Sequence, residues 1–144
     1  MAILNLVKYP DEFLYKKSKQ VVDFDVRLHE LLDDMLETMQ ANNGMGLAAV
    51  QIGRLVRACI VMTRDGLVEL INPEIIAAKG TYDCDEACLS RPGESYMIRR
   101  ANKIRVGAQD RHGNWHKYDF KGIEAVCVQH EMDHLDGILI GGDE

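Results

Sequence analysis

The chain has 144 residues, with 17 Lys and Arg against 23 Asp and Glu, which gives a formal net charge of -6 at neutral pH. Because 47% of the residues are hydrophobic and 28% are charged, the composition excludes intrinsic disorder and a disulfide-stapled miniprotein, and predicts one domain over residues 1–144. The acidic balance without a run of Lys or Arg argues against duplex nucleic acid or an anionic membrane as a partner.

The first predicted element is an amphipathic helix over roughly residues 25–42. Apolar side chains recur in it at spacings of three and four residues, at Leu28, Leu31, Leu32, Met35 and Met39. This spacing forms one helical stripe. Asp25 is a suitable N-cap, and the sequence Asn42-Asn43-Gly44 tolerates the positive φ at which many helices end.

A small-residue segment, Gly44–Gly53, follows this helix. One interpretation is a tight loop in which glycine and alanine allow close packing of the backbone. The other is a strand edge that pairs with an extended peptide, with the Gln51 amide facing a substrate oxygen. The spacing alone favours neither.

Two antiparallel hairpins are predicted next. Strand-like runs at 57–62 and 66–71 flank a turn at Asp65-Gly66, and those at 103–109 and 115–120 flank His112-Gly113-Asn114. A second helix is predicted over 122–135, with Gly137 as its C-terminal glycine. Two helices and antiparallel strands define an α+β fold.

One face of the second helix carries chemistry. His130 and His134 stand at i and i+4, a spacing at which two imidazoles grip one metal ion, and Glu131 beside them is a candidate general base. The alternative is an exposed polar turn, but apolar neighbours predict a half-buried helix in which unpaired imidazole and carboxylate groups are costly. The spacing therefore predicts a metal site.

A catalytic metal needs a third protein ligand, and the residues offer four candidates: Cys88, Cys84, His112 and His116. Cys88 is favoured because it follows an acidic turn at 83–86 and precedes a Pro-Gly loop, whereas the two histidines flank a hairpin turn. A structural site built from both cysteines and both helical histidines is a further alternative, although its spacing is long and it leaves Glu131 without a role.

The remaining cysteines, Cys59 and Cys127, lie in apolar runs and are expected to pack as small hydrophobes. No apolar run approaches the length of about 20 residues that crosses a bilayer. The segment 1–10 also lacks the features of a secretory signal. We therefore expect a cytoplasmic protein with reduced cysteines.

Three segments together resemble the peptide deformylase family, in the family's order. They are Gly44–Gln51 (Gly-Met-Gly-Leu-Ala-Ala-Val-Gln), Glu86–Ser90 (Glu-Ala-Cys-Leu-Ser) and Gln129–His134 (Gln-His-Glu-Met-Asp-His). The resemblance extends over nearly the whole chain. It implies a mostly antiparallel α+β domain with the metal-binding helix at its centre and an N-terminal helix.

The resemblance also implies roles for individual residues. Cys88, His130 and His134 would be the metal ligands, Glu131 the catalytic acid and base, and Gln51 and the backbone N–H of Leu89 the groups that hold the formyl oxygen. The residues expected to line the groove for the peptide backbone are Met45, Gly46 and Ala87. Those expected to surround the methionine side chain are Glu86, Arg100, Ile123, Val126 and Cys127.

The implied reaction removes the formyl group from the N-terminal methionine of newly made peptides and releases formate. Nascent chains at the ribosome are an implied partner, and ferrous iron is the implied metal, although a Cys-His-His set also suits zinc, nickel or cobalt. The departure from the family is Ala87, which replaces a glycine. It keeps open a peptide-binding protein without turnover, and the helix motif alone also fits a zinc peptidase.

Overall fold

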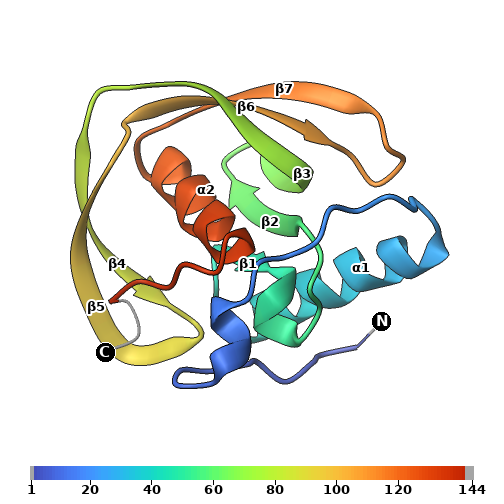
Figure 1. Ribbon diagram of the computed structural model, residues 1–144. Coiled ribbons are helices and arrows are strands. Elements are labelled where there is room, and N and C mark those ends of the chain that lie inside the picture. The colour runs from blue at the N-terminus through green and yellow to red at the C-terminus, as the bar shows by residue number, and fades with distance from the viewer. Residues whose placement is uncertain (1, 142–144) are drawn as a thin grey trace.

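In residues 2–141, which the computed structural model describes, two α-helices combine with seven strands and two short 3-10 helices (Figure 1). The elements in chain order are η1 (Glu12–Tyr15), α1 (Val26–Ala41), β1 (Gly46–Ala48), η2 (Ala49–Ile52), β2 (Ala58–Thr63), β3 (Gly66–Lys79), β4 (Tyr82–Cys88), β5 (Arg91–Arg100), β6 (Lys103–Gln109), β7 (Trp115–Lys121) and α2 (Gly122–Leu135).

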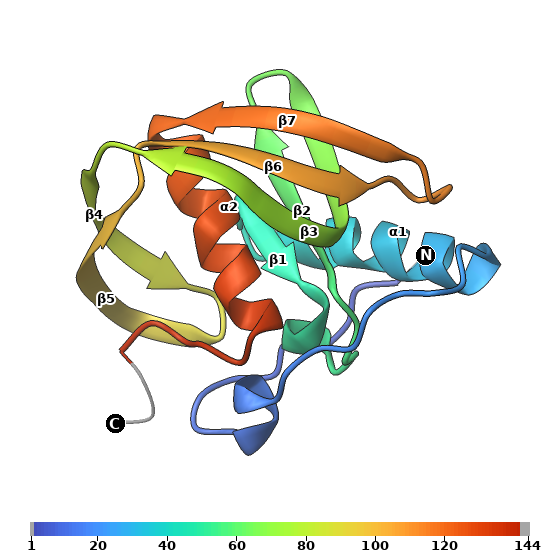
Figure 2. The same ribbon diagram turned by 45° about the horizontal axis from the view of Figure 1, so that its top comes forward.

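The strands form two antiparallel sheets around α2. One sheet has the order β1-β2-β3-β6-β7, and the other is the hairpin β4-β5. Figure 2 shows β3, β6 and β7 crossing one side of α2, with the β4-β5 hairpin curving around another side. The predicted α+β class, with antiparallel strands around a central helix, is confirmed.

The first helix forms as its sequence predicts. Asp25 accepts hydrogen bonds from the N–H groups of Arg27 and Leu28, and Asn43 has a φ of 57° just beyond the last turn. The buried stripe packs against β1 and β2 through Leu28, Leu32, Met35 and Met39. Because α1 covers the outer side of these strands, their other side is available to α2.

β3 is longer than the predicted strand, which ended at Ile71. Asn72 has a φ of 51° and Pro73 follows it, and the pairing with β6 shifts register at this point. The strand bends there, so that its first half pairs with β2 and its second half with β6. The preceding turn is Arg64-Asp65, one residue earlier than expected, since Thr63 pairs with Gly66.

The prediction of an acidic turn at 83–86 is wrong, because this segment lies in β4, which pairs with β5. Neither β4 nor β5 was predicted, because charged residues in both segments hide the alternation of inward-facing and outward-facing side chains. Along β4, Glu86 and Cys88 are buried while Asp83, Asp85 and Ala87 are exposed. Glu86 is buried because an arginine of β5 neutralises it, so the inward-facing residues of this strand are not all apolar.

No helix within residues 2–141 is long and apolar enough to cross a membrane.

Candidate active site

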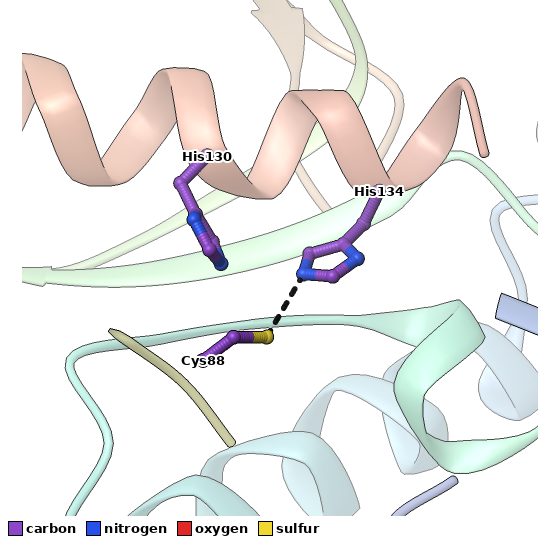
Figure 3. Close-up of side chains that lie close together, drawn as sticks. All are labelled: Cys88, His130 and His134. Carbon is purple, nitrogen blue, oxygen red and sulfur yellow. Dashed lines mark hydrogen bonds between the residues drawn. The ribbon is translucent and has the colours of Figure 1, made fainter. Parts of the chain in front are cut away.

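The end of β4 and one face of α2 bring a thiol and two imidazoles together. The ligand atoms of Cys88, His130 and His134 all lie within 4.8 Å of one another, and Cys88 Sγ is 3.3 Å from His134 Nε2 (Figure 3). The three residues are no more than 7% exposed. A buried set of one thiol and two imidazoles with converging donor atoms fits a divalent transition metal ion.

The structure distinguishes Cys88 from the other candidates for the third ligand. Cys84 faces the same side of β4 and lines the same pocket, but it lies outside the cluster of ligand atoms. His112 and His116 are exposed at the β6-β7 hairpin, where His116 Nε2 bonds to Asp110. The cysteine that completes the cluster is the one at the last position of β4.

A carboxylate fixes the orientation of His130. Glu86 Oε1 lies 2.9 Å from His130 Nδ1, so the other ring nitrogen faces the cluster. Arg100 donates two hydrogen bonds to Glu86, at 2.7 and 2.8 Å, and one to Asp133. Burial alone would raise the pKa of Glu86, but the bonds from Arg100 and His130 lower it, so this carboxyl is ionised. Such partners orient a ligating imidazole and raise its basicity.

The pKa values of the two histidines in the cluster are shifted in opposite directions. Burial opposes protonation of His130, but hydrogen bonds to Cys88 and Glu86 raise its pKa to about 10. Burial and the charge on His130 lower the pKa of His134 to about 3. His134 is therefore neutral at physiological pH, which is the form that ligates metal ions. His130 holds its proton when no metal is bound, so metal binding there would release that proton.

Glu131 lies beside the cluster and is 4% exposed. Burial is the main cause that raises its pKa to about 7. Its Oε1 is buried and has no hydrogen-bond partner among the described residues, while Oε2 would lie only 2.8 Å from a Cβ at Gly46. The absence of a side chain at Gly46 therefore makes room for this carboxyl group.

Gln51 approaches the cluster from η2. Its Oε1 accepts from the Ala48 N–H at 2.9 Å, which fixes the amide so that Nε2 lies 3.1 Å from Ser90 Oγ and 3.6 Å from Cys88 Sγ. The side chain is 1% exposed. This amide N–H group is thus held next to the thiol, at the base of the pocket.

A pocket of about 480 Å³ opens in front of these groups. Most of the site residues expected from the sequence line it: Met45, Gly46, Gln51, Glu86, Ala87, Cys88, Leu89, Ile123, Val126, Cys127, His130 and Glu131. Arg100 does not line it, because its guanidinium lies behind Glu86. His134 lies deeper still, at 1% exposure.

Two residues in this network had no predicted role. Asp133 bonds to Arg100, and its only signal in the sequence was its place inside the motif His130–His134. Ser90 is fully buried and accepts from Gln51. Both lie within the quoted motifs, but single-sequence spacing does not reveal a partner on another element.

Ala87 has an ordinary strand conformation. It lies in β4 with its side chain exposed, and the described non-glycine residues with positive φ are Asn43 and Asn72. Alanine therefore causes no backbone strain at this position.

A strand-lined pocket beside a Cys-His-His cluster and a buried glutamate defines the class of metal-dependent hydrolases. The model of the polypeptide deformylase family matches residues 3–141. The chain belongs to this family.

Relatives and solved structures agree with this assignment. The chain is 48% identical to the peptide deformylase of Caldicellulosiruptor bescii, over 96% of this chain and 84% of the relative. It is 45% identical to peptide deformylase 1 of Clostridium perfringens, over 96% of each.

The crystal structure of the Thermotoga maritima peptide deformylase matches with a TM-score of 0.93 and 36% identity, over 96% of this chain and 95% of that one. The Ehrlichia chaffeensis enzyme in complex with actinonin also gives 0.93, at 37% identity, over 96% of this chain and 87% of that one.

Proposed function

We propose that Cys88, His130 and His134 hold one divalent metal ion, and that Glu131, Gln51 and the Leu89 N–H carry out the deformylation. The protein is a metal-dependent hydrolase that removes the formyl group from N-formylmethionyl peptides and releases formate. The observation that carries the assignment of roles is the convergence of three buried donor atoms within 4.8 Å. When bound, a metal ion polarises a carbonyl and lowers the pKa of a water molecule towards about 7.

Glu131 is the proton carrier in this proposal. Its carboxyl is next to the cluster, lacks a partner at Oε1 and has a pKa raised to about 7 by burial. A carboxyl with such a pKa accepts and releases a proton near neutral pH. Glu131 would take a proton from the attacking water and give it to the amine that leaves.

Gln51 and Leu89 would stabilise negative charge on the formyl oxygen. Gln51 Nε2 is fixed beside Cys88 Sγ, and Leu89 directly follows that cysteine in the pocket wall. Donors held in place in a buried site need no reorganisation as charge develops, and each is typically worth about 3 kcal/mol.

The rest of the pocket would hold the peptide. β1 pairs with β2 along one edge, and Met45, Gly46 and, across the pocket, Ala87 line the space beside its other edge. An extended peptide fits there by strand addition. Ile123, Val126, Cys127 and the stem of Glu86 would contact the methionine side chain, while Arg100 would act through Glu86.

We further propose that the metal in the cell is ferrous iron and that the substrates are nascent chains at the ribosome. We also propose that residues 1–144 form a single catalytic domain. Mixed thiolate and imidazole ligands also suit zinc, nickel and cobalt. The four cysteines are free, which fits the reducing environment of the cytoplasm.

Formate release tests this function. Protein loaded anaerobically with Fe²⁺ or Ni²⁺ should release formate from formyl-Met-Ala-Ser, while acetyl-Met-Ala-Ser and the internal peptide bonds stay intact. Cleavage of internal bonds would indicate a zinc peptidase. Binding of the formyl peptide without formate release would indicate a peptide-binding protein.

A further inference from the structure

The N-terminal chain bonds to both elements that carry the proposed formyl-oxygen donors. Val7 N–H donates to the carbonyl of Gln51 at 2.7 Å, and Tyr9 N–H donates to the carbonyl of Ser90 at 2.7 Å. Ser90 directly follows Leu89, whose N–H is the second proposed donor. We call Val7–Tyr9 the strap. None of the chemistry described above uses it.

Gln51 and Ser90 belong to different parts of the fold. Gln51 lies in η2, directly after β1 of the five-stranded sheet, whereas Ser90 is in the turn between β4 and β5 of the separate hairpin. Within residues 2–141, no strand of one sheet pairs with a strand of the other. Figure 2 shows the N-terminal chain passing both η2 and this turn. The strap therefore supplies main-chain hydrogen bonds to two elements that sheet pairing does not connect.

The side chains around the strap face two parts of the site. Val7 and Tyr9 pack on a core cluster that contains the proposed metal ligand Cys88. Lys8, between them, lines the active-site pocket, as does Leu6 just before them. The strap thus lies between the core next to Cys88 and the substrate pocket.

Arg91 holds the strap at its Tyr9 end. Its guanidinium carbon lies 3.7 Å from the centre of the Tyr9 ring and 5.4 Å from that of Tyr96, and its Nη1 donates to the carbonyl of Ile140 at 3.0 Å. The side chain is 2% exposed. A cation over an aromatic ring is attracted most strongly where water is excluded. Since Arg91 directly follows Ser90, the stacking of Arg91 on Tyr9 reinforces the hydrogen bond between Tyr9 and Ser90.

We propose that the strap, held by Arg91, positions the Gln51 amide relative to the end of β4, so that Gln51 and the Leu89 N–H converge on one formyl oxygen. A donor stabilises developing charge only when its support holds it within a fraction of an ångström of the productive position. Arg91 and Tyr9 are therefore positioning residues that act through Gln51. This inference rests on the proposed deformylase function.

Replacement of Arg91 tests the proposal. Arg91→Met keeps an unbranched side chain but removes the cation and the donor. It should lower kcat for formyl-Met-Ala-Ser about tenfold at equal metal content and change KM by less than about twofold, because the donors act on charge that develops in the transition state. Tyr9→Leu, which keeps the main-chain N–H and removes the ring, should give the same division between kcat and KM. Unchanged kcat in either variant would contradict the proposal.

A second arginine provides the matched control. Arg57 Nη1 donates to the carbonyl of Leu135 at 3.1 Å and pairs with Asp136, so this side chain holds the end of α2 in place of the strap. Arg57→Met should keep kcat within about twofold. An equal loss of kcat in Arg57→Met and Arg91→Met would show general loosening of the fold and would overturn the proposal.

A double-mutant cycle separates positioning from a general structural role. Gln51→Leu removes the amide and should lower kcat about 100-fold by itself. Arg91→Met added to Gln51→Leu should lower kcat by less than about twofold more, because the residue through which it acts is gone. A tenfold loss from Arg91→Met in both backgrounds would overturn the strap proposal alone. Unchanged kcat in Gln51→Leu would contradict the proposed function of Gln51, and the strap proposal with it.

Amide hydrogen exchange, measured by NMR on Zn²⁺-loaded protein, tests the strap without turnover. Arg91→Met should speed exchange of the Val7 and Tyr9 N–H groups at least about tenfold, because their hydrogen bonds to Gln51 and Ser90 would open more often. Arg57→Met should leave both exchange rates unchanged. Equal rates in the unmodified protein and in Arg91→Met would show that Arg91 does not hold the strap and would overturn the proposal.

Discussion

Two pairs of histidine rings in this protein have nearly the same geometry and different environments. His130 and His134 pack edge to face with centroids 5.0 Å apart, and His29 and His112 do so at 5.2 Å. The first pair is buried beside a cysteine thiol, whereas His112 is exposed at a hairpin and His29 Nε2 bonds to the carbonyl of Arg111. A close ring pair alone does not make a metal site.

The arginines near these pairs sharpen the comparison. Arg100 bridges Glu86 and Asp133, and Arg111 bridges Glu69 and Asp33. In the first network one carboxylate also binds a histidine, His130 Nδ1, and turns the other nitrogen of that ring towards the cluster. The feature that distinguishes the site is thus a chain of contacts from arginine through carboxylate to imidazole, completed by a thiol.

The largest effect is expected from removal of the thiol that distinguishes the buried histidine pair from the exposed one. Cys88→Ala should lose nearly all bound metal on dialysis and nearly all turnover, since two imidazoles alone hold a catalytic ion poorly. Cys84→Ala, on the same face of β4, should keep both, as should His112→Ala in the exposed pair. Analysis of the metal content of the three variants tests this. If Cys88→Ala retained the metal and Cys84→Ala lost it, Cys84 would be the ligand in place of Cys88.

Replacement of Glu131 tests the chemistry without removing the ligands. Glu131→Gln should keep the metal and lower kcat about 1000-fold, because an amide of nearly the same shape cannot accept a proton. Turnover close to that of the unmodified protein, measured on samples with equal metal content, would exclude this residue as the proton carrier.

The carboxylates provide a smaller effect with a matched control. Glu86→Gln should weaken metal affinity about 10- to 100-fold, because it removes the charge that orients His130. Glu69→Gln changes the corresponding partner of Arg111 and should leave affinity unchanged. Competition with a chelator measures both, and equal affinities would show that the contact with Glu86 does not support the metal site.

The smallest effect concerns Ala87. Because its φ is not positive and its side chain is exposed, Ala87→Gly should change kcat/KM by less than about threefold, under about 1 kcal/mol in transition-state binding. Steady-state kinetics on formyl-Met-Ala-Ser tests this, and a gain of about tenfold or more would indicate that the alanine crowds the substrate.

The elements with regular apolar spacing were predictable from the sequence. The stripe from Leu28 to Met39 predicted α1, and the face that carries His130 and His134 predicted α2 close to its observed bounds. The prediction of α1 succeeds because this helix buries a single stripe, which the periodicity records directly. α2 is buried on most sides, and its prediction rested on the face with the two histidines and on Gly137 as the C-terminal glycine.

The β4-β5 hairpin was not predictable in this way. Its inward-facing Glu86 is buried only because Arg100, fourteen residues later, neutralises it. The sequence also does not determine whether Cys84 or Cys88 joins the cluster, for the same reason. Both side chains face one side of β4, and only Cys88 lies close to the histidines of α2. Partners on other elements decide these positions, and a single sequence does not record them.

A metal titration of the apoprotein tests the central claim most directly. Bound Fe²⁺ or Ni²⁺ and formate release from formyl-Met-Ala-Ser are followed together, under anaerobic conditions, in the unmodified protein and in Cys88→Ala. The account predicts that binding and turnover rise together and saturate at one ion per chain, and that both are lost in the variant. Full turnover by metal-free protein, or by the variant, would contradict it.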